Sequence, residues 1–307
     1  KMKRVGVFFS GVFFLVSAVK PVNLTPQVHL KGGGFVMGTN NEHRPADLEG
    51  PARKASVKPF MMDTHTVTNE QFRDFVRQTK YKTEAEVYGW SFVLDYLAPK
   101  KVKENKSIQR LDDAKHWLAV PGSWWRVPEG KGTGIKGREK HPVVHISRKD
   151  AASYCTWARR RLPTEKEWEF AARGGLKGKQ YPWGNSHTDL HNKMNIWQGK
   201  FPKENTKEDG YVGTAPSMHF PPNGFGLFQM LGNVWEWTDD EWKDSKPVPT
   251  KEEEKKYVLK GGSFLDSADG SFNHRVAVTT RMGNTADSGG HNTGFRCAAD
   301  AEGKKEL

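Results

Sequence analysis

A chain of 307 residues with a net charge of +12 and a mean hydropathy of −0.76 is long enough for one large domain, or two small ones, with a well-buried core. Its 31 glycines and 11 tryptophans are typical of tight turns held by large aromatic side chains, which disfavours a helical bundle. Basic residues are mixed with acids, as in residues 251–256, and no basic module with interleaved aromatics is found. The charge therefore does not indicate a nucleic-acid partner.

The N-terminus has the pattern of a secretory signal peptide. Lys1, Lys3 and Arg4 precede an apolar run over residues 5–19, and small residues near its end would suit a signal peptidase. The run is shorter than the roughly 20 apolar residues that a membrane-spanning helix needs, so no membrane span is expected after cleavage. We assign residues 1–19 to the signal peptide; an uncleaved anchor or a buried strand is the alternative.

Short strands are predicted at the start of the folded part. Residues 20–27 are assigned to a linker, residues 28–39 are predicted to form a short strand and a tight turn, and another strand is expected at 57–62. The polar, proline-containing segment 40–53 between them is predicted to be a loop.

A helix is predicted to begin after Thr68. Thr68 and Gln71 have the Thr-x-x-Gln spacing of a capping box, and Phe72 and Phe75 fall on one helical face. The periodicity then weakens, and residues 87–140 are interpreted as an irregular region anchored by tryptophans.

Another strand is predicted at residues 141–146, where the period of two would place His141 and His145 on one face. Two histidines are too few for a metal site, so ordinary polar roles are favoured. A helix capped by Ser147 follows, and a second helix is predicted after Thr164, which forms a capping box with Glu167.

From residue 181 to residue 300 the chain is rich in glycine, asparagine, proline and tryptophan, which predicts short strands and long ordered loops. No internal repeat and no long linker is found. We therefore assign residues 28–300 to a single domain and residues 301–307 to a C-terminal tail.

The last four residues, Lys304-Lys305-Glu306-Leu307, are similar to the Lys-Asp-Glu-Leu retrieval signal. Together with the signal peptide they predict the lumen of the endoplasmic reticulum. Two glycosylation sequons, at Asn23 and Asn105, suit the same compartment.

The chain has two cysteines, Cys155 and Cys297, which lie 142 positions apart. In an oxidising lumen an isolated pair is most simply a disulfide, and closing so long a loop is worth about 5 kcal/mol as an upper figure. Two buried free thiols are the main alternative, and a catalytic thiol pair is a more distant one.

The segment beginning Gly261-Gly262-Ser263 and the later run Asn292-Thr293-Gly294-Phe295-Arg296-Cys297 resemble the C-terminal signature of the formylglycine-generating enzymes, also called sulfatase-modifying factors. In the active members a pair of cysteines follows the Gly-Gly-Ser. Here the first of these positions falls on Asp266, and the second on Ser271 or Asn273.

Further blocks match the same family in the same order, including residues 161–171, 181–184, 222–227 and 231–237. Details of residues 269–285 look like the catalytically silent vertebrate paralogue within that family. The resemblance covers residues 28–300 and implies an α+β fold: a single compact, loop-rich domain with little regular secondary structure, distantly similar to C-type lectins. It also implies a disulfide between the two cysteines.

The resemblance further implies calcium. The first site would use the Asn195 side chain, the Ile196 carbonyl, the Asp209 carboxylate and the Tyr211 carbonyl, which are the hard oxygen ligands that calcium prefers. Loop capping by the Asn and the Asp is the alternative role for that set.

The second calcium site would use the Gly232 and Val234 carbonyls and the Glu236 carboxylate, with Gln229 where the family has Asn or Asp. Gln is neutral and longer by one methylene, which weakens the expectation for this second site.

The leading functional hypothesis is a non-catalytic member of this family. Copper-dependent oxidation at a Cu(I) site needs soft thiolate ligands, and Asp266, Ser271 and Asn273 supply none, so no copper is expected. Such a protein would bind sulfatases or the active oxidase and modulate, in the inhibitory direction, sulfatase activation. Pairing as a homodimer or a heterodimer stays open.

Three residues match positions of the family's substrate pocket and are candidates for a peptide groove: Trp235, Ser263 and Asn292. Packing or turn formation is the alternative role for each. Two other functions remain open: an enzyme using Asp266, Asp269 and His274 for acid–base chemistry, and a lectin-like glycan-binding protein.

Overall fold

The computed structural model describes residues 23–243, 255–271 and 273–301. The predicted signal peptide (1–19) and residues 302–307 of the predicted tail lie outside the described residues. No helix in the described part of the chain combines the length and the apolar character that crossing a bilayer would require.

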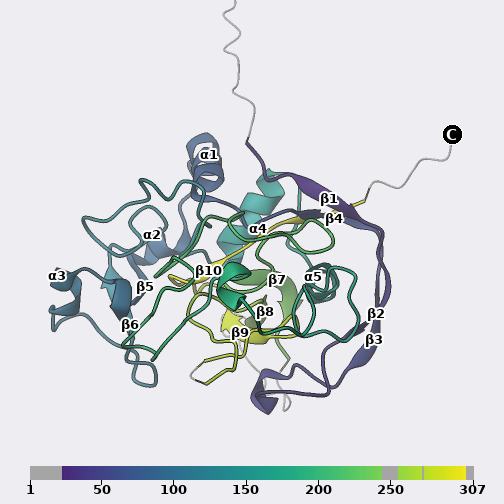
Figure 1. The fold of residues 1–307 in the computed structure, drawn as a ribbon. Helices are drawn as coiled ribbons and strands as arrows, with labels where there is room; N and C mark the ends of the chain where they lie inside the picture. The colour runs from purple at the N-terminus through teal and green to yellow at the C-terminus, as the bar shows by residue number, and fades with distance from the viewer. Residues whose placement is uncertain (1–22, 244–254, 272, 302–307) are drawn as a thin grey trace, which may run out of the picture.

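A three-stranded antiparallel sheet joins the two ends of the domain (Figure 1). Its central strand is β4 (Phe60–Asp63), which pairs on one side with β1 (Gln27–Leu30) and on the other with β11 (Ala298–Asp300). The first and last described strands are therefore held by one strand between them. The two ends of the described chain are thus part of one sheet.

The second sheet has four strands in the order β10-β7-β8-β9. They are β10 (Thr293–Gly294), β7 (Trp235–Glu241), β8 (Lys256–Lys260) and β9 (Arg281–Thr285). β10 runs parallel to β7, whereas the other pairs are antiparallel. Of the C-terminal signature identified in the sequence, Thr293 and Gly294 lie in this sheet, and the described residues of the segment from Gly261 to Arg275 lie in the loop that follows β8.

Two hairpins complete the strands, and both correct the sequence-based expectations. β2 (Gly33–Met37) pairs with β3 (Arg53–Val57), so the strand expected at 57–62 is wrong as one element and is split between β3 and β4. β5 (Trp90–Leu94) pairs with β6 (Trp117–Pro121) inside the segment that was expected to be irregular. Alternating Trp90, Phe92 and Leu94 were the missed signal for a strand.

Three helices begin at the predicted residues: α1 (Asn69–Thr79), α4 (Arg148–Trp157) and α5 (Glu165–Ala172). Each has a complete capping box, in which the N-cap hydroxyl and the side chain three residues later satisfy backbone amides reciprocally. Two short helices were not predicted: α2 (Glu84–Tyr88), which starts at another capping box, and α3 (Lys100–Lys103). Single 3₁₀ turns lie at Pro45–Asp47, Asp95–Leu97 and Leu190–Asn192.

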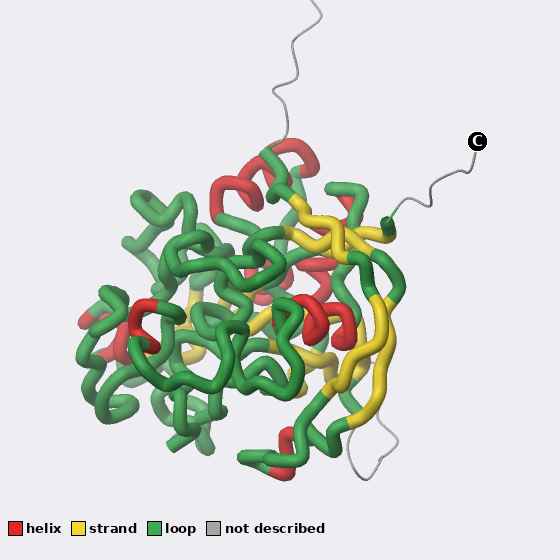
Figure 2. Tube along the Cα trace, turned by 45° about the vertical axis from the view of Figure 1, so that its right-hand side comes forward, coloured by secondary structure: helices red, strands yellow, loops and turns green. Residues whose placement is uncertain are grey.

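Most of the described chain is loop, as expected (Figure 2). Four tryptophans that are almost completely buried hold these loops: Trp125, Trp168, Trp235 and Trp237. The indole N–H of Trp237, for example, donates to the carbonyl of Ile146 at 2.8 Å, which ties β7 to the loop before α4.

The strand predicted at residues 141–146 is wrong. The segment makes only an isolated bridge at Pro142, and His145 has a left-handed φ of 61°, so His141 and His145 do not share a strand face. Nδ1 of His141 contacts Thr214 Oγ1, whereas His145 is buried, contacts Ser91 Oγ through Nδ1 and stacks on His291. Tertiary contacts, and not strand periodicity, determine the conformation of residues 141–146.

The domain begins earlier than predicted. Gln27 belongs to β1, and Thr25 is buried with its hydroxyl donating to Gln71 Oε1 at 3.0 Å. The described part of the expected linker at 20–27 is therefore part of the folded unit.

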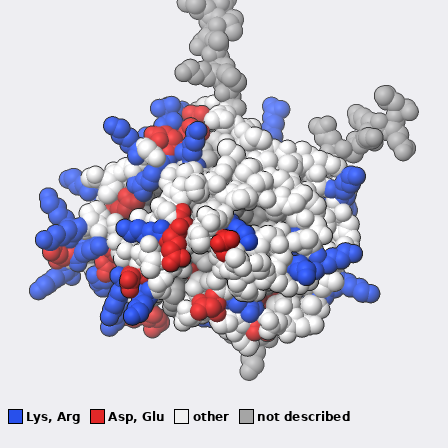
Figure 3. All heavy atoms as spheres, in the orientation of Figure 1, with Lys and Arg blue, Asp and Glu red and all other residues white. Residues whose placement is uncertain are grey.

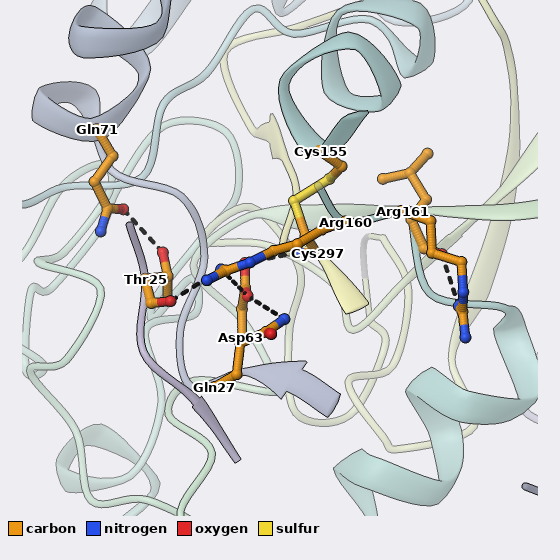
Figure 4. The surroundings of a disulfide bond; sticks show 9 residues. Thr25, Gln27, Asp63, Gln71, Cys155, Arg160, Arg161 and Cys297 are labelled. Atoms are coloured by element: carbon orange, nitrogen blue, oxygen red, sulfur yellow. Dashed lines mark hydrogen bonds and ion pairs between the residues drawn. A yellow bond between two sulfur atoms is a disulfide. The ribbon is translucent and has the colours of Figure 1, made fainter. Parts of the chain in front are cut away.

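The two cysteines form a disulfide (Figure 4). Cys155 lies on α4, and Cys297 lies just before β11; their Cα atoms are 5.7 Å apart. Beside them, Asp63 accepts hydrogen bonds from the Cys297 amide, from Gln27 Nε2 and from the Arg160 guanidinium. The disulfide therefore joins α4 to the three-stranded sheet where its polar groups are already satisfied.

A buried ion pair ties the two sheets together. Arg296, which is fully buried, donates to both carboxylate oxygens of Glu236 on β7. The same guanidinium donates to four backbone carbonyls: Asp63 and Thr64, which close β4, and Phe228 and Gln229. The Arg296 side chain thus donates hydrogen bonds to one carboxylate and four carbonyls, which come from three separate stretches of chain.

Surface charge is mixed on the face shown in Figure 3. Lys and Arg gather on the left of this view, over the region of α2, α3 and β6, where Asp and Glu lie among them; acidic side chains also lie near the centre, and the upper right is largely neutral. The net charge of +12 is not gathered into a patch of one sign on this face.

We expect the disulfide to be a major source of stability. Replacing both cysteines, C155A/C297A, should lower the free energy of unfolding by about 2–5 kcal/mol, because a loop of 142 positions is released in the unfolded chain. Urea denaturation followed by tryptophan fluorescence measures this. The single variant C155A should lose a similar amount, and an unchanged denaturation midpoint in the double variant would contradict the expectation.

Candidate functional site

A cavity of about 260 Å³ lies where the second sheet meets the β5–β6 hairpin and the loop after β8. The apolar side chains of its lining include Phe92, Trp117, Trp235, Leu265 and Met282. The polar side chains include Asp266, Asn273, His274, Asn284 and Asn292. The volume is below the roughly 300–1,000 Å³ of pockets for drug-sized ligands, so the cavity suits a few side chains of a larger partner.

Asp266 organises the loop that forms one side of this cavity. Its Oδ2 accepts from the Ser263 amide at 2.7 Å and from Ser263 Oγ at 2.8 Å. Its Oδ1 accepts from the His274 amide at 3.1 Å and lies 3.3 Å from His274 Nδ1. A carboxylate has about four acceptor sites, so this one is close to saturated by its own loop.

His274 lies between two carboxylates. Besides Asp266, its Nε2 is 3.7 Å from an oxygen of Asp47, and its ring packs edge-on against Trp235 at a centroid distance of 4.9 Å. Burial by itself would lower the pKa of His274, but the hydrogen bond to Asp266 and the charges of Asp266 and Asp47 outweigh it and raise the pKa above its usual value. The imidazolium form is therefore favoured at this wall.

The three predicted groove residues lie together. Trp235 and Asn292 line the cavity, and Ser263 is fully buried directly beneath it, where its hydroxyl accepts from Asn292 Nδ2 at 3.0 Å. Asn292, Ser263 and Asp266 thus form one chain of hydrogen bonds from the cavity wall into the core.

The structure separates the two candidates for the second position in the signature. Asn273 lines the same cavity as Asp266 and donates to the Leu265 carbonyl at 2.6 Å. Ser271 lines a different cavity, beside Asp269, whose Oδ1 accepts from the Ser271 amide and from Ser267 Oγ. Asp269 is held as a turn former on that side.

Sequence reasoning missed part of this wall. Phe92 and Trp117 reach the cavity from the unpredicted β5–β6 hairpin, and Asp47 reaches His274 from a 3₁₀ turn. These residues lie more than 100 positions from Asp266, and nothing in their local pattern indicates the pairing.

In the first predicted calcium set, Asp209 presents a buried carboxylate oxygen without a hydrogen-bond partner among the described residues. Its Oδ1 accepts from the Tyr211 amide at 2.9 Å, and the oxygen without such a partner is Oδ2. Burial raises the pKa of this carboxyl to about 6, against the opposing hydrogen bonds from the Tyr211 and Ile196 backbone. An uncompensated buried carboxylate oxygen is what a hard divalent ion would satisfy.

The second predicted set fits less well. Glu236 would supply its only charge, yet both of its oxygens accept from Arg296, and one also accepts from Trp168 Nε1 at 2.8 Å. Gln229 leaves its Oε1 without a partner within the described residues, while its Nε2 donates to Pro216. Because Arg296 neutralises the carboxylate, this set presents no net negative charge to an ion.

The described residues contain no group of three or more His, Cys, Asp or Glu side chains arranged to hold a metal. The calcium sets rely on amide and carbonyl oxygens instead. Both sequon asparagines, Asn23 and Asn105, are exposed.

Comparison with known proteins agrees with this architecture. The model of the sulfatase-modifying factor enzyme 1-like domain matches residues 14–301. The chain is 51% identical over 275 residues to a Bos taurus protein named inactive C-alpha-formylglycine-generating enzyme 2, covering 89% of this chain and 88% of that one. It is 45% identical to the Mus musculus formylglycine-generating enzyme, covering 93% and 78%.

Among solved structures, PvdO from Pseudomonas aeruginosa superimposes with a TM-score of 0.63 at 23% identity, covering 90% of this chain and 94% of that one. CarF superimposes with a TM-score of 0.56 at 18% identity, covering 91% and 99%. At these identities the likeness concerns the fold alone. A compact, loop-rich α+β domain with this signature defines one class of protein: the chain belongs to the formylglycine-generating enzyme, or sulfatase-modifying factor, family.

The raised pKa of His274 predicts a pH-dependent stability. The protonated ring stabilises the fold, so its contribution is complete below the unfolded pKa of about 6.5 and is lost as the pH rises through the folded value. The variant H274Q removes this contribution. The difference in melting temperature between the wild type and H274Q should therefore be larger at pH 6 than at pH 8.

Measuring the difference between the two proteins is essential, because His65, His116, His141 and His145 have lowered pKa values through burial and give the opposite slope. These four histidines are present in both proteins, so their contributions cancel in the difference between the two melting temperatures. A difference in melting temperature that does not change with pH would contradict the raised pKa of His274.

Proposed function

We propose that this protein is a non-catalytic member of the family that binds the segment of sulfatases recognised by the active oxidase, or the oxidase itself, and modulates sulfatase activation in the inhibitory direction. The observation that carries the proposal is the cavity. Its lining combines aromatic and amide side chains, which suits a peptide, and it includes Asp266, the residue on which the family resemblance puts the first cysteine position. The second position, on Ser271 or Asn273 by the same resemblance, also lacks a thiol.

The chain offers no thiol for copper. It has two cysteines in all, and both are in the disulfide, outside the cavity lining. Carboxylate, amide and imidazole groups are hard or borderline ligands and cannot replace a pair of thiolates as a Cu(I) site for oxygen activation. The printed name of the Bos taurus relative, an inactive enzyme 2, points the same way.

Acid–base catalysis by Asp266 is the weaker alternative. Its two oxygens are engaged by Ser263 and by the His274 backbone and ring, so the carboxylate acts as a structural acceptor. Asp269 is exposed, its Oδ1 accepts from Ser267 and Ser271, and it lines a different cavity from His274. The three groups are therefore not gathered in one cavity with a free carboxylate beside His274, as joint acid–base catalysis would need.

The expected compartment suits this function. We assign the protein to the lumen of the endoplasmic reticulum, on the basis of its leader, its Lys-Lys-Glu-Leu end and its two exposed sequons. A disulfide persists in such an oxidising compartment.

A labelled peptide containing the Cys-x-Pro-x-Arg sulfatase motif tests the proposal. Fluorescence anisotropy should show saturable binding to the wild type. N292A should bind about fivefold or more weakly, because it removes a cavity amide and its bond to Ser263. Mass spectrometry of the same peptide, incubated with copper and dioxygen, should show no aldehyde.

Q78A is a matched control, since Gln78 is an exposed amide on α1 away from the cavity, and its binding should equal that of the wild type. Conversion of the peptide cysteine to formylglycine by protein free of other oxidases would overturn the non-catalytic assignment. Equal binding by N292A and Q78A would overturn the assignment of the groove.

We propose that calcium occupies the first set, with Asn195, Ile196, Asp209 and Tyr211 as ligands, and that its role is structural. Calcium should raise the melting temperature of the wild type, and a chelator should reverse this. D209N should abolish the calcium effect, because it removes the only carboxylate of the set.

D112N, a change of the same kind at an exposed aspartate, should keep the full calcium effect. A calcium-dependent shift that survives in D209N would show that the ion binds elsewhere.

A further inference from the structure

A second and larger cavity, of about 580 Å³, lies apart from the peptide groove. It is enclosed by three stretches of chain: the loop that leaves β2, the loop after α5, and residues 275–279 before β9. Residues 274 and 275 separate the two cavities, since His274 faces the first and Arg275 faces the second. No part of the proposed function uses this second cavity.

The lining is basic and rich in amides. Three cationic side chains contribute: Arg173, Lys179 and Arg275. Four amides join them: Asn40, Asn41, Gln180 and Asn185. Among the described residues no Asp or Glu belongs to the lining, which distinguishes this cavity from the first one, where Asp266 forms part of the wall.

The positive charge here exceeds the nearby negative charge. Behind the wall, the buried Lys260 and the guanidinium of Arg173 pair with Glu169, and Arg281 pairs with Glu165. Glu49, held by Thr279 Oγ1 at 2.8 Å, supplies a third carboxylate. The three carboxylates of Glu49, Glu165 and Glu169 therefore balance the three positive charges of Arg173, Lys260 and Arg281.

The positive charges of Arg275 and Lys179 are not balanced by these three carboxylates. Neither has a carboxylate within ion-pair distance in the described parts of the chain, although Glu49 is close enough to interact with Arg275 electrostatically. The cavity therefore carries an excess of positive charge that its own walls do not neutralise.

Two donors at this wall are buried and unpartnered. Arg275 donates through Nη2 to the Asn41 carbonyl at 2.7 Å, but its Nε has no acceptor among the described residues. Gln180 Nε2 is also without an acceptor there; its side chain lies near the Tyr181 hydroxyl, but not in hydrogen-bonding geometry. Buried donors of this kind cost stability unless an acceptor satisfies them.

We propose that this cavity binds a tetrahedral oxyanion ester on a small hydroxylated carrier, such as a sugar sulfate or a sugar phosphate. Arg275 and Gln180 would donate to the oxyanion, with Lys179 adding charge, and the amides of Asn40 and Asn185 would face the hydroxyl groups. Planar guanidinium and amide donors suit oxyanion oxygens, and surrounding amides suit sugar hydroxyls.

Isothermal titration calorimetry at constant ionic strength tests the proposal with defined probes: glucose 6-sulfate, glucose 6-phosphate, inorganic sulfate, inorganic phosphate and glucose. At least one ester should bind saturably, and glucose should bind far more weakly. R275Q should weaken ester binding about tenfold or more, because it removes a charge-assisted donor.

Q180E is an independent second variant. It is nearly isosteric, it removes the unpartnered donor and it adds a negative charge, so it should weaken binding at least as much as R275Q. The control is R77Q, which removes the same charge from an exposed position on α1 and should change binding by less than about twofold. Melting temperatures and near-ultraviolet circular dichroism check that each variant is folded.

The ester arms identify the source of the anion: tighter binding of the sulfate ester assigns sulfate, and tighter binding of the phosphate ester assigns phosphate. Three outcomes would overturn the proposal: no probe binds saturably at millimolar concentration, glucose binds as tightly as its esters, or folded R275Q and Q180E bind as tightly as R77Q. Peptide binding in the first cavity is measured separately, so failure of one proposal does not imply failure of the other.

Discussion

The buried pair of Arg296 and Glu236 is the contact on which the rest of this fold depends. Arg296 satisfies the carboxylate on β7 and, in addition, carbonyls at the end of β4 and in the loop at 228–229. A guanidinium and a carboxylate are costly to bury singly, and breaking such a pair typically costs about 3–5 kcal/mol. Because the neighbouring residues are Trp235 and Cys297, the same contact positions both the cavity wall and the disulfide.

Charge neutralisation at Glu236 has a second consequence. The family resemblance makes this residue a calcium ligand, but in this chain its charge is already matched by Arg296, and its neighbour Gln229 is neutral. At Asp209 the opposite holds: a buried carboxylate oxygen lacks any partner in the described chain. The two predicted calcium-ligand sets contain similar kinds of ligand. They differ in whether a neighbouring positive charge already neutralises the carboxylate.

The first cavity has a well-ordered polar wall. Asp266 accepts from Ser263 and His274 and so braces the loop that forms one side of this cavity. The family resemblance implies that the active members carry a cysteine at this position. A charged, saturated acceptor is well suited to hold a binding surface and poorly suited to react. His274 lines the first cavity and the next residue, Arg275, lines the second, so one short stretch of chain shapes both cavities.

Local sequence was sufficient where the determining contacts are local. The capping boxes at Thr68 and Thr164 and the start at Ser147 were predictable because each joins residues three apart, and ordered motifs across the chain were enough to indicate the family and the α+β fold. Four features were not predictable: the β5–β6 hairpin, the environment of His145, the sharing of one cavity by Asp266 and Asn273, and the excess charge at Arg275. They depend on which distant segments pack together and on which buried charges find partners, and these are properties of the assembled chain that no local pattern encodes.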